Sequence, residues 1–198
     1  MSKGSDRKKE ILAAALARFA RFGFRKTTLG EVAADVGLVQ SALYKYFASK
    51  TALFNSVIDD FGERAMAAVE SAESSEKTVE HKLRRMLRDG YEEVVDSAER
   101  YHVPIEVWNE MRPQLMERSA RHKRTLIDHV TRVLERGIVD ERLVCQDPLV
   151  VAEVIHLMSD NLYERTLLGE ITRAEGLKYI DSMVHTLMHG LKNRGTGN

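Results

Sequence analysis

Cysteine and proline are scarce in this chain of 198 residues, and it carries no net charge. The single cysteine, Cys145, cannot form an intrachain disulfide, so we expect a protein of the reducing cytoplasm. Only three prolines among many strong helix formers predict an all-α fold. No apolar run reaches the roughly 18 residues that a membrane-spanning helix needs. The sequence therefore predicts a helical, cytoplasmic protein without a membrane segment.

The zero net charge is the sum of two unequal parts. The whole chain has 30 basic and 30 acidic side chains. Residues 1–50 hold ten basic and four acidic groups (10 − 4 = +6), and residues 51–198 hold twenty and twenty-six (20 − 26 = −6). A uniformly neutral surface would argue against nucleic-acid binding, because phosphates attract Lys and Arg. The observed segregation instead indicates that residues 1–50 are the part that meets phosphates.

Helix signals divide the basic segment into short elements. Apolar residues recur at helical spacing over residues 11–22, and Gly23 is expected to end that helix. Thr28 and Glu31 have the spacing of a capping box, which predicts the start of a second helix. Gly37 should end this second helix, after which apolar spacing resumes. Two short helices joined by a tight glycine turn are typical of a helix-turn-helix.

The acidic remainder predicts longer helices. Asp147 followed by Pro148, and Thr172 three residues before Glu175, are start signals for the last two of them. The expected ranges are 50–70, 79–97, 103–116 with interruptions at Pro104 and Pro113, 118–136 ended by Gly137, 148–168 and 172–193.

The second helix of the predicted pair would expose polar side chains. A helix of that size fits the DNA major groove, where Gln40 can pair with adenine and Ser41 with several bases. Hydroxyl and ammonium groups nearby are suited to phosphates. The alternative is an ordinary helical hairpin with a solvated polar face. The candidate DNA-binding residues are Thr28, Gln40, Ser41, Tyr44, Lys45, Tyr46 and Lys50.

The same segment resembles the N-terminal DNA-binding signature of TetR-type transcriptional repressors. The resemblance lies in TTLGEVAADVGL at residues 27–38, ALYKYF at 42–47 and SKTAL at 49–53. It covers roughly residues 8–55, and the later residues match only as a helical layout. The resemblance implies a homodimer that binds a pseudo-palindromic operator and releases it when a small molecule binds the C-terminal domain.

Residue by residue, the resemblance assigns roles in DNA binding. Thr28, Tyr44 and Lys50 fall where the family contacts phosphates, whereas Gln40, Ser41 and Lys45 fall on its base-reading surface. Val39 stands where many members have a capping Ser, so this cap should be missing. Ser41-Ala42 replaces a frequent Gly-Thr pair, which affects the expected operator sequence rather than DNA binding itself.

The resemblance also implies a division into three parts. We expect a helix-turn-helix domain at 1–50, a helical effector-binding and dimerisation domain at 51–193, and a flexible tail at 194–198. The effector is expected to be a largely apolar small molecule, because such sites are mostly apolar with a few polar groups. The residues that could line such a site are also of types that commonly fill an ordinary core. The candidate ligand-binding residues are Met86, Tyr91, Trp108, Met111, His156, Met158 and Tyr163.

The last two helices carry apolar stripes that, by resemblance, should form a four-helix interface with a second copy of the chain. Packing within one chain is the alternative. A dimer is also expected because one short recognition helix reads too few bases. The stripes comprise Leu149, Ala152, Ile155, Leu162, Leu177, Ile180, Val184 and Leu187.

Two motifs keep a metal-dependent enzyme open as an alternative. Glu99-x-x-His102 and Glu153-x-x-His156 both match the Glu-x-x-His spacing of di-iron sites in helical bundles. The further glutamates that such a site needs cannot be assigned, and the first motif precedes Pro104 at an expected helix end. We therefore expect a chain that is not an enzyme and that holds no metal or other cofactor.

His185 and His189 lie one helical turn apart, as a zinc-binding pair would. Thr186 stands where a zinc protease needs Glu, so a core or interface role is the preferred interpretation. A DNA-binding protein without an effector and a helical adaptor for other proteins are the remaining alternatives.

Overall fold

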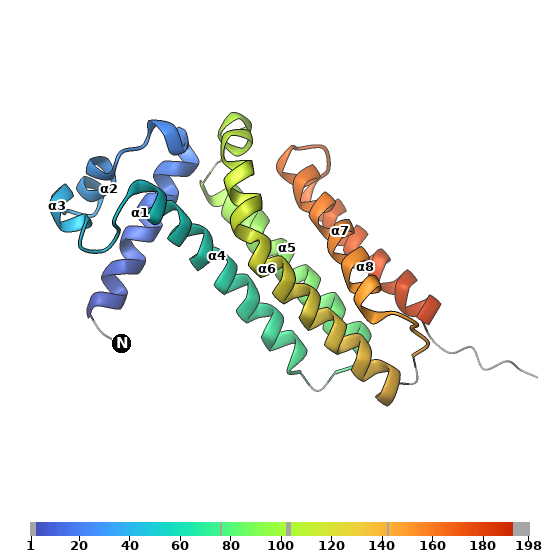
Figure 1. Ribbon diagram of the computed structural model, residues 1–198. Coiled ribbons are helices and arrows are strands. Elements are labelled where there is room, and N and C mark those ends of the chain that lie inside the picture. Colours follow the sequence, from blue (N-terminus) through green and yellow to red (C-terminus); the bar gives the residue numbers. More distant parts are fainter. Residues whose placement is uncertain (1–2, 76, 102–103, 142, 192–198) are drawn as a thin grey trace, which may run out of the picture. The chain divides into compact units, whose positions relative to one another are not determined.

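In the computed structural model, the described residues, 3–75, 77–101, 104–141 and 143–191, form α-helices joined by turns (Figure 1). This confirms the predicted all-α fold. None of the helices in these segments is long and apolar enough to cross a lipid bilayer. They are α1 (Lys3–Lys26), α2 (Leu29–Asp35), α3 (Gln40–Leu43), α4 (Lys50–Glu73), α5 (Val79–Tyr101), α6 (Ile105–Asp140), α7 (Pro148–Leu167) and α8 (Arg173–Leu191).

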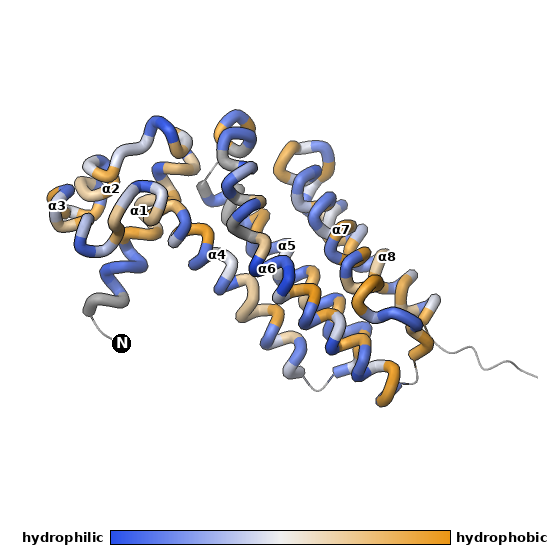
Figure 2. Tube along the Cα trace, viewed as in Figure 1, coloured by the Kyte–Doolittle hydropathy of each residue, from blue (hydrophilic) through white to orange (hydrophobic). Residues whose placement is uncertain are grey.

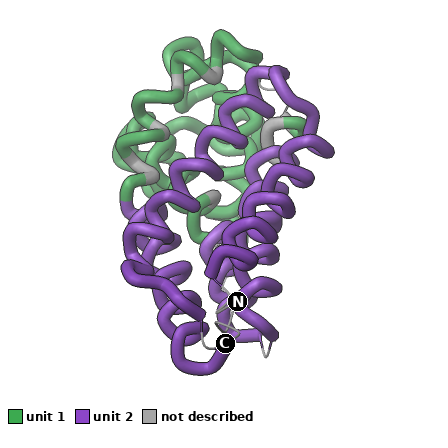
Figure 3. The backbone as a smooth tube through the Cα atoms, turned by 90° about the vertical axis from the view of Figure 1, so that its right-hand side faces the viewer, with its two compact units in different colours: residues 1–63, 97–120 green, residues 64–96, 121–198 purple. Residues whose placement is uncertain are grey.

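The chain divides into two compact units (Figure 3). Unit 1 comprises Met1–Glu63 and Ser97–Ala120, and unit 2 comprises Arg64–Asp96 and Arg121–Asn198. Helices α4 and α6 each contribute residues to both units. The units therefore differ from the expected division at residue 50, because the end of α5 and the first part of α6 belong to unit 1. The functional boundary at residue 50 stays a prediction, and the expected tail lies outside the described residues.

The local start signals of the last two helices are confirmed. Asp147 caps α7 by accepting a hydrogen bond from the N–H of Val150 at 3.1 Å, and a proline occupies the first turn. Thr172 and Glu175 form the capping box of α8: the Glu175 N–H donates to Thr172 Oγ1 at 3.2 Å, and the Thr172 N–H donates to Glu175 Oε2 at 2.8 Å.

The prediction for the region after Pro104 was partly wrong. Two helices were expected, the second ended by Gly137, but α6 continues through both Pro113 and Gly137. Proline removes one backbone hydrogen bond, and Pro113 is an exposed residue of this long helix. Gly137 allows close packing instead of ending the helix. A Cβ atom there would lie 2.6 Å from Leu143 Cδ1 and 2.6 Å from Val79 Cγ2.

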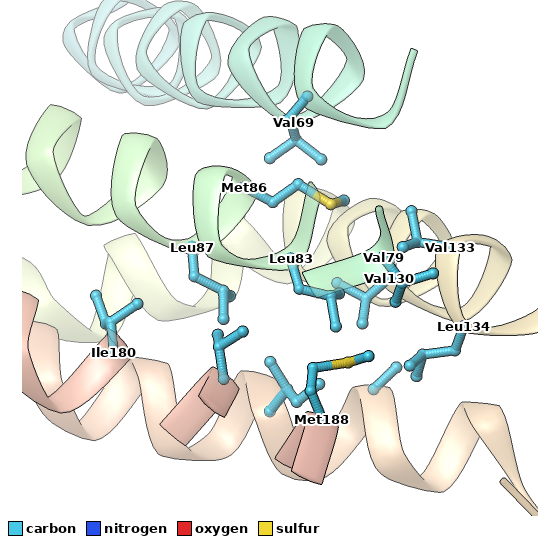
Figure 4. Close-up of a cluster of buried hydrophobic side chains, with 14 of the residues drawn as sticks. Val69, Val79, Leu83, Met86, Leu87, Val130, Val133, Leu134, Ile180 and Met188 are labelled. Carbon is cyan, nitrogen blue, oxygen red and sulfur yellow. The ribbon is translucent and has the colours of Figure 1, made fainter. Parts of the chain in front are cut away.

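The core of unit 2 consists of apolar side chains from α4 to α8 (Figure 4). Val69 of α4, Leu83 and Leu87 of α5, Val130 of α6 and Ile180 of α8 are at most 1% exposed. Helices α5 and α6 carry both hydrophilic and hydrophobic residues along their length, as amphipathic helices do (Figure 2). Each large apolar side chain buried in this way contributes about 1.5–3 kcal/mol to folding.

A buried charged cluster joins α4 to α6 within unit 2. The Glu73 carboxylate at the end of α4 is 7% exposed. It accepts hydrogen bonds from Arg132 Nε and Nη2, each at 3.1 Å, and contacts His129 Nδ1. Arg136 Nη2 lies 3.6 Å from Glu73 Oε1. Burial alone would raise the pKa of Glu73, but the hydrogen bonds and charges of Arg132 and His129 hold it below its ordinary value.

We expect acid to weaken unit 2 through Glu73. The pKa of Glu73 is lower in the folded chain than in the unfolded chain. The ionised carboxylate therefore makes its full contribution to stability above the pKa of the unfolded chain, about 4.3, and loses it as pH falls through the pKa of the folded chain. The free energy of unfolding in urea should therefore fall more steeply toward low pH for the wild type than for Glu73→Gln. A gap between the two proteins that does not change with pH would contradict this assignment.

Candidate nucleic-acid interface

The start of α2 is fixed by the predicted capping box. The N–H of Glu31 donates to Thr28 Oγ1 at 3.3 Å, and Glu31 Oε2 accepts from the Thr28 N–H at 2.8 Å and from its hydroxyl at 2.7 Å. These hydrogen bonds from Thr28 lower the pKa of Glu31. Thr28 is exposed. The cap therefore places an exposed hydroxyl at the start of α2, where a phosphate contact was predicted.

Gly37 makes the turn between α2 and α3. Its φ of +64° is in the left-handed region, which favours glycine. The Gly37 N–H donates to Ala34 O at 3.0 Å and the Leu38 N–H to Ala33 O at 2.8 Å, the paired bonds that end many helices. This turn sets where α3 begins relative to α2.

Buried apolar side chains anchor α3 and the residues after it in the core of unit 1, so that their polar side chains are exposed. Leu43 is fully buried and Phe47 is 4% exposed, and both pack in the core of unit 1 with Val32 of α2. The remaining side chains of the predicted recognition surface are exposed, with Tyr44 at 50%. These exposed residues are Gln40, Ser41, Tyr44, Lys45 and Tyr46.

Helix α3 lacks a side-chain cap, as expected from Val39 at its N-cap position. Its first residue, Gln40, instead lies against the first turn of α2. A Cβ atom built on Gly30 would be only 3.2 Å from Gln40 Oε1. The amide of Gln40 is therefore close to the capping box at Thr28.

Lys50 has a structural role that the sequence did not predict. Its Nζ donates to the carbonyls of Phe24 at 2.8 Å, Thr27 at 2.9 Å and Arg25 at 3.3 Å. These bonds satisfy carbonyl groups at the end of α1 that have no helical partner. The ammonium also lies 4.5 Å from the Phe24 ring centroid. A phosphate contact by Lys50 stays a prediction.

Two further contacts hold the helices of unit 1 together. Arg18 of α1 pairs with Asp35 of α2 and lies 3.3 Å from Glu31 Oε1. The hydrogen bond from Arg18 lowers the pKa of Asp35. Glu110 of α6 accepts a hydrogen bond from the N–H of Arg25 at 2.9 Å. These partners are 17 and 85 residues apart, so no local pattern could have revealed them.

The candidate ligand-binding residues differ in burial and do not all lie on the same side of unit 2. Met86 and Tyr91 are buried in the core of unit 2, and the Tyr91 ring stacks on Tyr163 with centroids 5.7 Å apart. His156 is also buried, on the inner face of α7. Met158 does not join them, because it is half exposed on the opposite face of α7. The side chains of Trp108 and Met111 lie outside what the structure describes.

The outer face of α7 and α8 carries an apolar groove of about 880 Å³. Half-exposed residues line it, including Val150, Val154, Leu157 and Met158 of α7 and Tyr179 of α8. Most residues of the apolar stripes that were predicted to form the dimer interface do not line this groove. Its members Ala152, Ile155, Ile180 and Val184 are buried in the core of the same chain, whereas Leu162 and Leu187 line the groove.

The structure does not assemble the metal sites considered from the sequence. Glu153 is exposed whereas His156 is buried, so the two side chains do not share one environment on α7. His102 falls outside the described residues. His185 and His189 are exposed, with ring centroids 6.3 Å apart. Within the described part of the chain, no three His, Cys, Asp or Glu side chains are grouped to hold a metal ion.

The capped start of α2, the turn at Gly37 and the exposed polar residues of and after α3 form a helix-turn-helix, a motif that DNA-binding proteins use. Residues 11–57 match the family model of bacterial regulatory proteins of the tetR family. The match covers the helix-turn-helix segment of unit 1, so this part of the chain is similar to the tetR family of bacterial regulatory proteins.

Individual regulators and solved structures are also similar to this chain. The HTH-type transcriptional regulator YdgC of Bacillus subtilis (strain 168) is 37% identical over 70 residues, which are 35% of this chain and 36% of YdgC. YfiR, an HTH-type transcriptional regulator of the same organism, is 26% identical over 176 residues, 85% of this chain and 84% of YfiR. The crystal structure of a TetR-like transcriptional regulator from Rhodococcus sp. RHA1 shares the fold, with a TM-score of 0.68 and 22% identity over 93% of this chain and 96% of that one.

Proposed function

We propose that this regulator is a homodimeric repressor that binds a pseudo-palindromic operator and leaves it when a small molecule binds unit 2. The exposed surface of Gln40, Ser41, Tyr44 and Lys45 supports this proposal most directly. Amide and hydroxyl groups can read base edges, and the ammonium and phenol can contact phosphates. This surface lies in the segment of +6 net charge, which favours the approach of DNA.

Dimerisation follows from the size of the recognition helix. Helix α3 has four residues and can contact few base pairs, whereas a two-fold dimer places two such helices in successive major grooves. The groove on the outer face of α7 and α8 supports a second copy of the chain as the partner. Half-exposed apolar side chains gathered on one face are a candidate interaction site.

Substituting Leu157 in the groove should disrupt the dimer. Leu157 is 61% exposed in the single chain, and in a two-fold interface Leu157→Arg places a charge on each partner. Losing about 1.5–3 kcal/mol of burial on each side should weaken dimerisation at least about a hundredfold. Sedimentation equilibrium measures the dissociation constant of the dimer. Val139→Arg, at a 79% exposed apolar residue of α6, is the matched control. Equal dimerisation of both variants would place the interface elsewhere.

Release by an effector is the second part of the proposal. Helices α4 and α6 contribute to the cores of both units. No flexible linker separates the two parts of either helix. We therefore propose that a ligand in unit 2 shifts these helices and changes the separation of the two recognition helices. The dimer then no longer fits adjacent major grooves.

Selection from random duplex DNA tests the repressor proposal without knowledge of the operator. The full chain should enrich an inverted repeat whose half-sites lie about one helical turn, or a multiple of it, apart. Placed between a promoter and a reporter gene, the enriched sequence should lower reporter output when the protein is produced. Failure to enrich any sequence, or a rise in reporter output, would contradict repression.

A further inference from the structure

His156 is a buried imidazole without a hydrogen-bond partner in the described part of the chain. The residue is 6% exposed, and neither Nδ1 nor Nε2 makes a hydrogen bond there. It shares the inner face of α7 with Ala152, Ile155 and Ser159, which are all buried. Its Nε2 lies 3.2 Å from Asp160 Oδ2, close enough for electrostatic attraction but outside hydrogen-bond geometry.

Other buried polar groups of unit 2 show that its interior normally satisfies such atoms. His129, which is 7% exposed, contacts the Glu73 carboxylate, and the Ser159 hydroxyl donates to Ile155 O at 2.9 Å. Arg84 Nε and Asp181 Oδ1 also lack hydrogen bonds, but they face each other at 3.4 Å, as His156 Nε2 faces Asp160. His156 Nδ1 is thus the buried atom of this group for which the described residues supply neither a hydrogen bond nor an ion pair. Unpaired buried polar groups are rare in native proteins, and each requires an explanation.

His156 belongs to a polar row on α7. Asp160 and Tyr163 follow it at positions i+4 and i+7, which places the three side chains on one side of the helix over about 10 Å. Burial, followed by the charge of Asp160 and by Tyr91, raises the pKa of the Tyr163 phenol. Tyr163 is therefore a neutral hydroxyl beside the stacked Tyr91 ring. The row leads from the buried His156 to the partly exposed Asp160 and Tyr163, and offers polar contacts beside the apolar core.

We propose that His156 is the polar anchor of the effector site and that the effector is a neutral, mostly apolar molecule with a hydrogen-bond donor. This inference rests on the proposed effector-released repressor. A proton on Nε2, attracted by Asp160, leaves Nδ1 as the acceptor for a ligand hydroxyl. The Asp160 carboxylate repels an anionic ligand, so an alcohol is favoured over a carboxylic acid. Because His156 is closed to solvent, ligand entry requires movement of α7 or its neighbours.

The alcohol n-octanol and the carboxylate octanoate carry the same length of alkyl chain and serve as probes. With the full wild-type chain, n-octanol should raise the midpoint of thermal unfolding and shift the ¹⁵N signals of the His156 ring. Octanoate should do neither. His156→Phe keeps a planar ring but removes both nitrogens, so it should lose the octanol response. Its midpoint without ligand should equal or exceed that of the wild type, because an unpaired buried group is gone. His185→Phe, on the exposed face of α8, should keep the response.

The possible results separate the anchor from the repressor function. If His156→Phe responds to octanol as the wild type does, His156 is not the anchor of the ligand. A lower unfolding midpoint of this variant without ligand would also contradict the proposal, because it would show a structural role for His156. A stronger response to octanoate, or no response to either probe, overturns the neutral ligand class. The ring signals of the wild type give an answer even if the variant does not fold. DNA selection by the same proteins tests the repressor proposal separately, since His156→Phe should still enrich the operator.

Discussion

Replacing both Tyr44 and Lys45 by Ala should weaken operator binding about a hundredfold or more. Each well-placed contact to a base or phosphate contributes about 1–3 kcal/mol, and the two side chains are presented twice in a dimer. Both are exposed, whereas the neighbouring Leu43 and Phe47 hold the segment in the core of unit 1. The substitutions should therefore remove contacts to DNA without unfolding the domain. An electrophoretic mobility shift assay with the selected duplex measures the loss.

The control for this variant is Lys123→Ala, which removes an exposed charge from unit 2. It should bind the same duplex as tightly as the wild type. Sedimentation should show that both proteins remain dimers. If the double variant binds as tightly as Lys123→Ala, then the segment of α3 and the residues that follow it does not enter the groove.

Gly176→Ala should lower the free energy of unfolding by about 3 kcal/mol, at the upper end of the usual cost of overpacking a core. A Cβ at this position of α8 would lie 2.0 Å from Tyr91 Oη and 2.4 Å from its Cζ. Tyr91 cannot easily give way: it is fully buried, stacks on Tyr163, and its hydroxyl lies 2.7 Å from Thr166 Oγ1. For a chain of this size the loss corresponds to a drop of about 6–12 °C in Tm.

Gly190→Ala is the matched control in the same helix. Apart from its own helix backbone, no atom of the described residues lies within 4 Å of a Cβ built there, so the substitution should stabilise the helix by about 0.5–1 kcal/mol. Combining Gly176→Ala with Tyr91→Leu should reduce the cost of the glycine substitution, because the clashing ring is absent. Equal effects of the two glycine substitutions would show that Tyr91 does not confine Gly176.

The features predicted correctly from the sequence depend on interactions over a few residues. The capping box of Thr28 and Glu31 and the cap at Asp147 each connect groups three residues apart, so residue type and spacing suffice. The exposure of Gln40 and Tyr44 likewise follows from the buried positions of Leu43 and Phe47 in the same short segment.

Features that depend on distant partners were missed. Gly137 was predicted to end a helix, but it accommodates Leu143 and Val79. Helix α7 is apolar on both faces, so its pattern could not show that Ile155 faces the core while Leu157 faces outward. Lys50 is predicted to contact phosphate from its position alone. Its hydrogen bonds to backbone carbonyls could not be predicted, because those carbonyls belong to residues at the end of α1. In each case the decisive contact comes from another part of the fold.

The affinity of the full chain for its selected duplex, measured against salt concentration, tests the central claim most directly. Binding through the basic segment predicts that the logarithm of affinity falls linearly with the logarithm of salt concentration, by about 0.9 for each phosphate neutralised. The slope should lie between about −2, for Lys45 of two subunits, and about −11, for the full excess of six charges in each subunit. An affinity that does not change with salt would contradict DNA binding through residues 1–50.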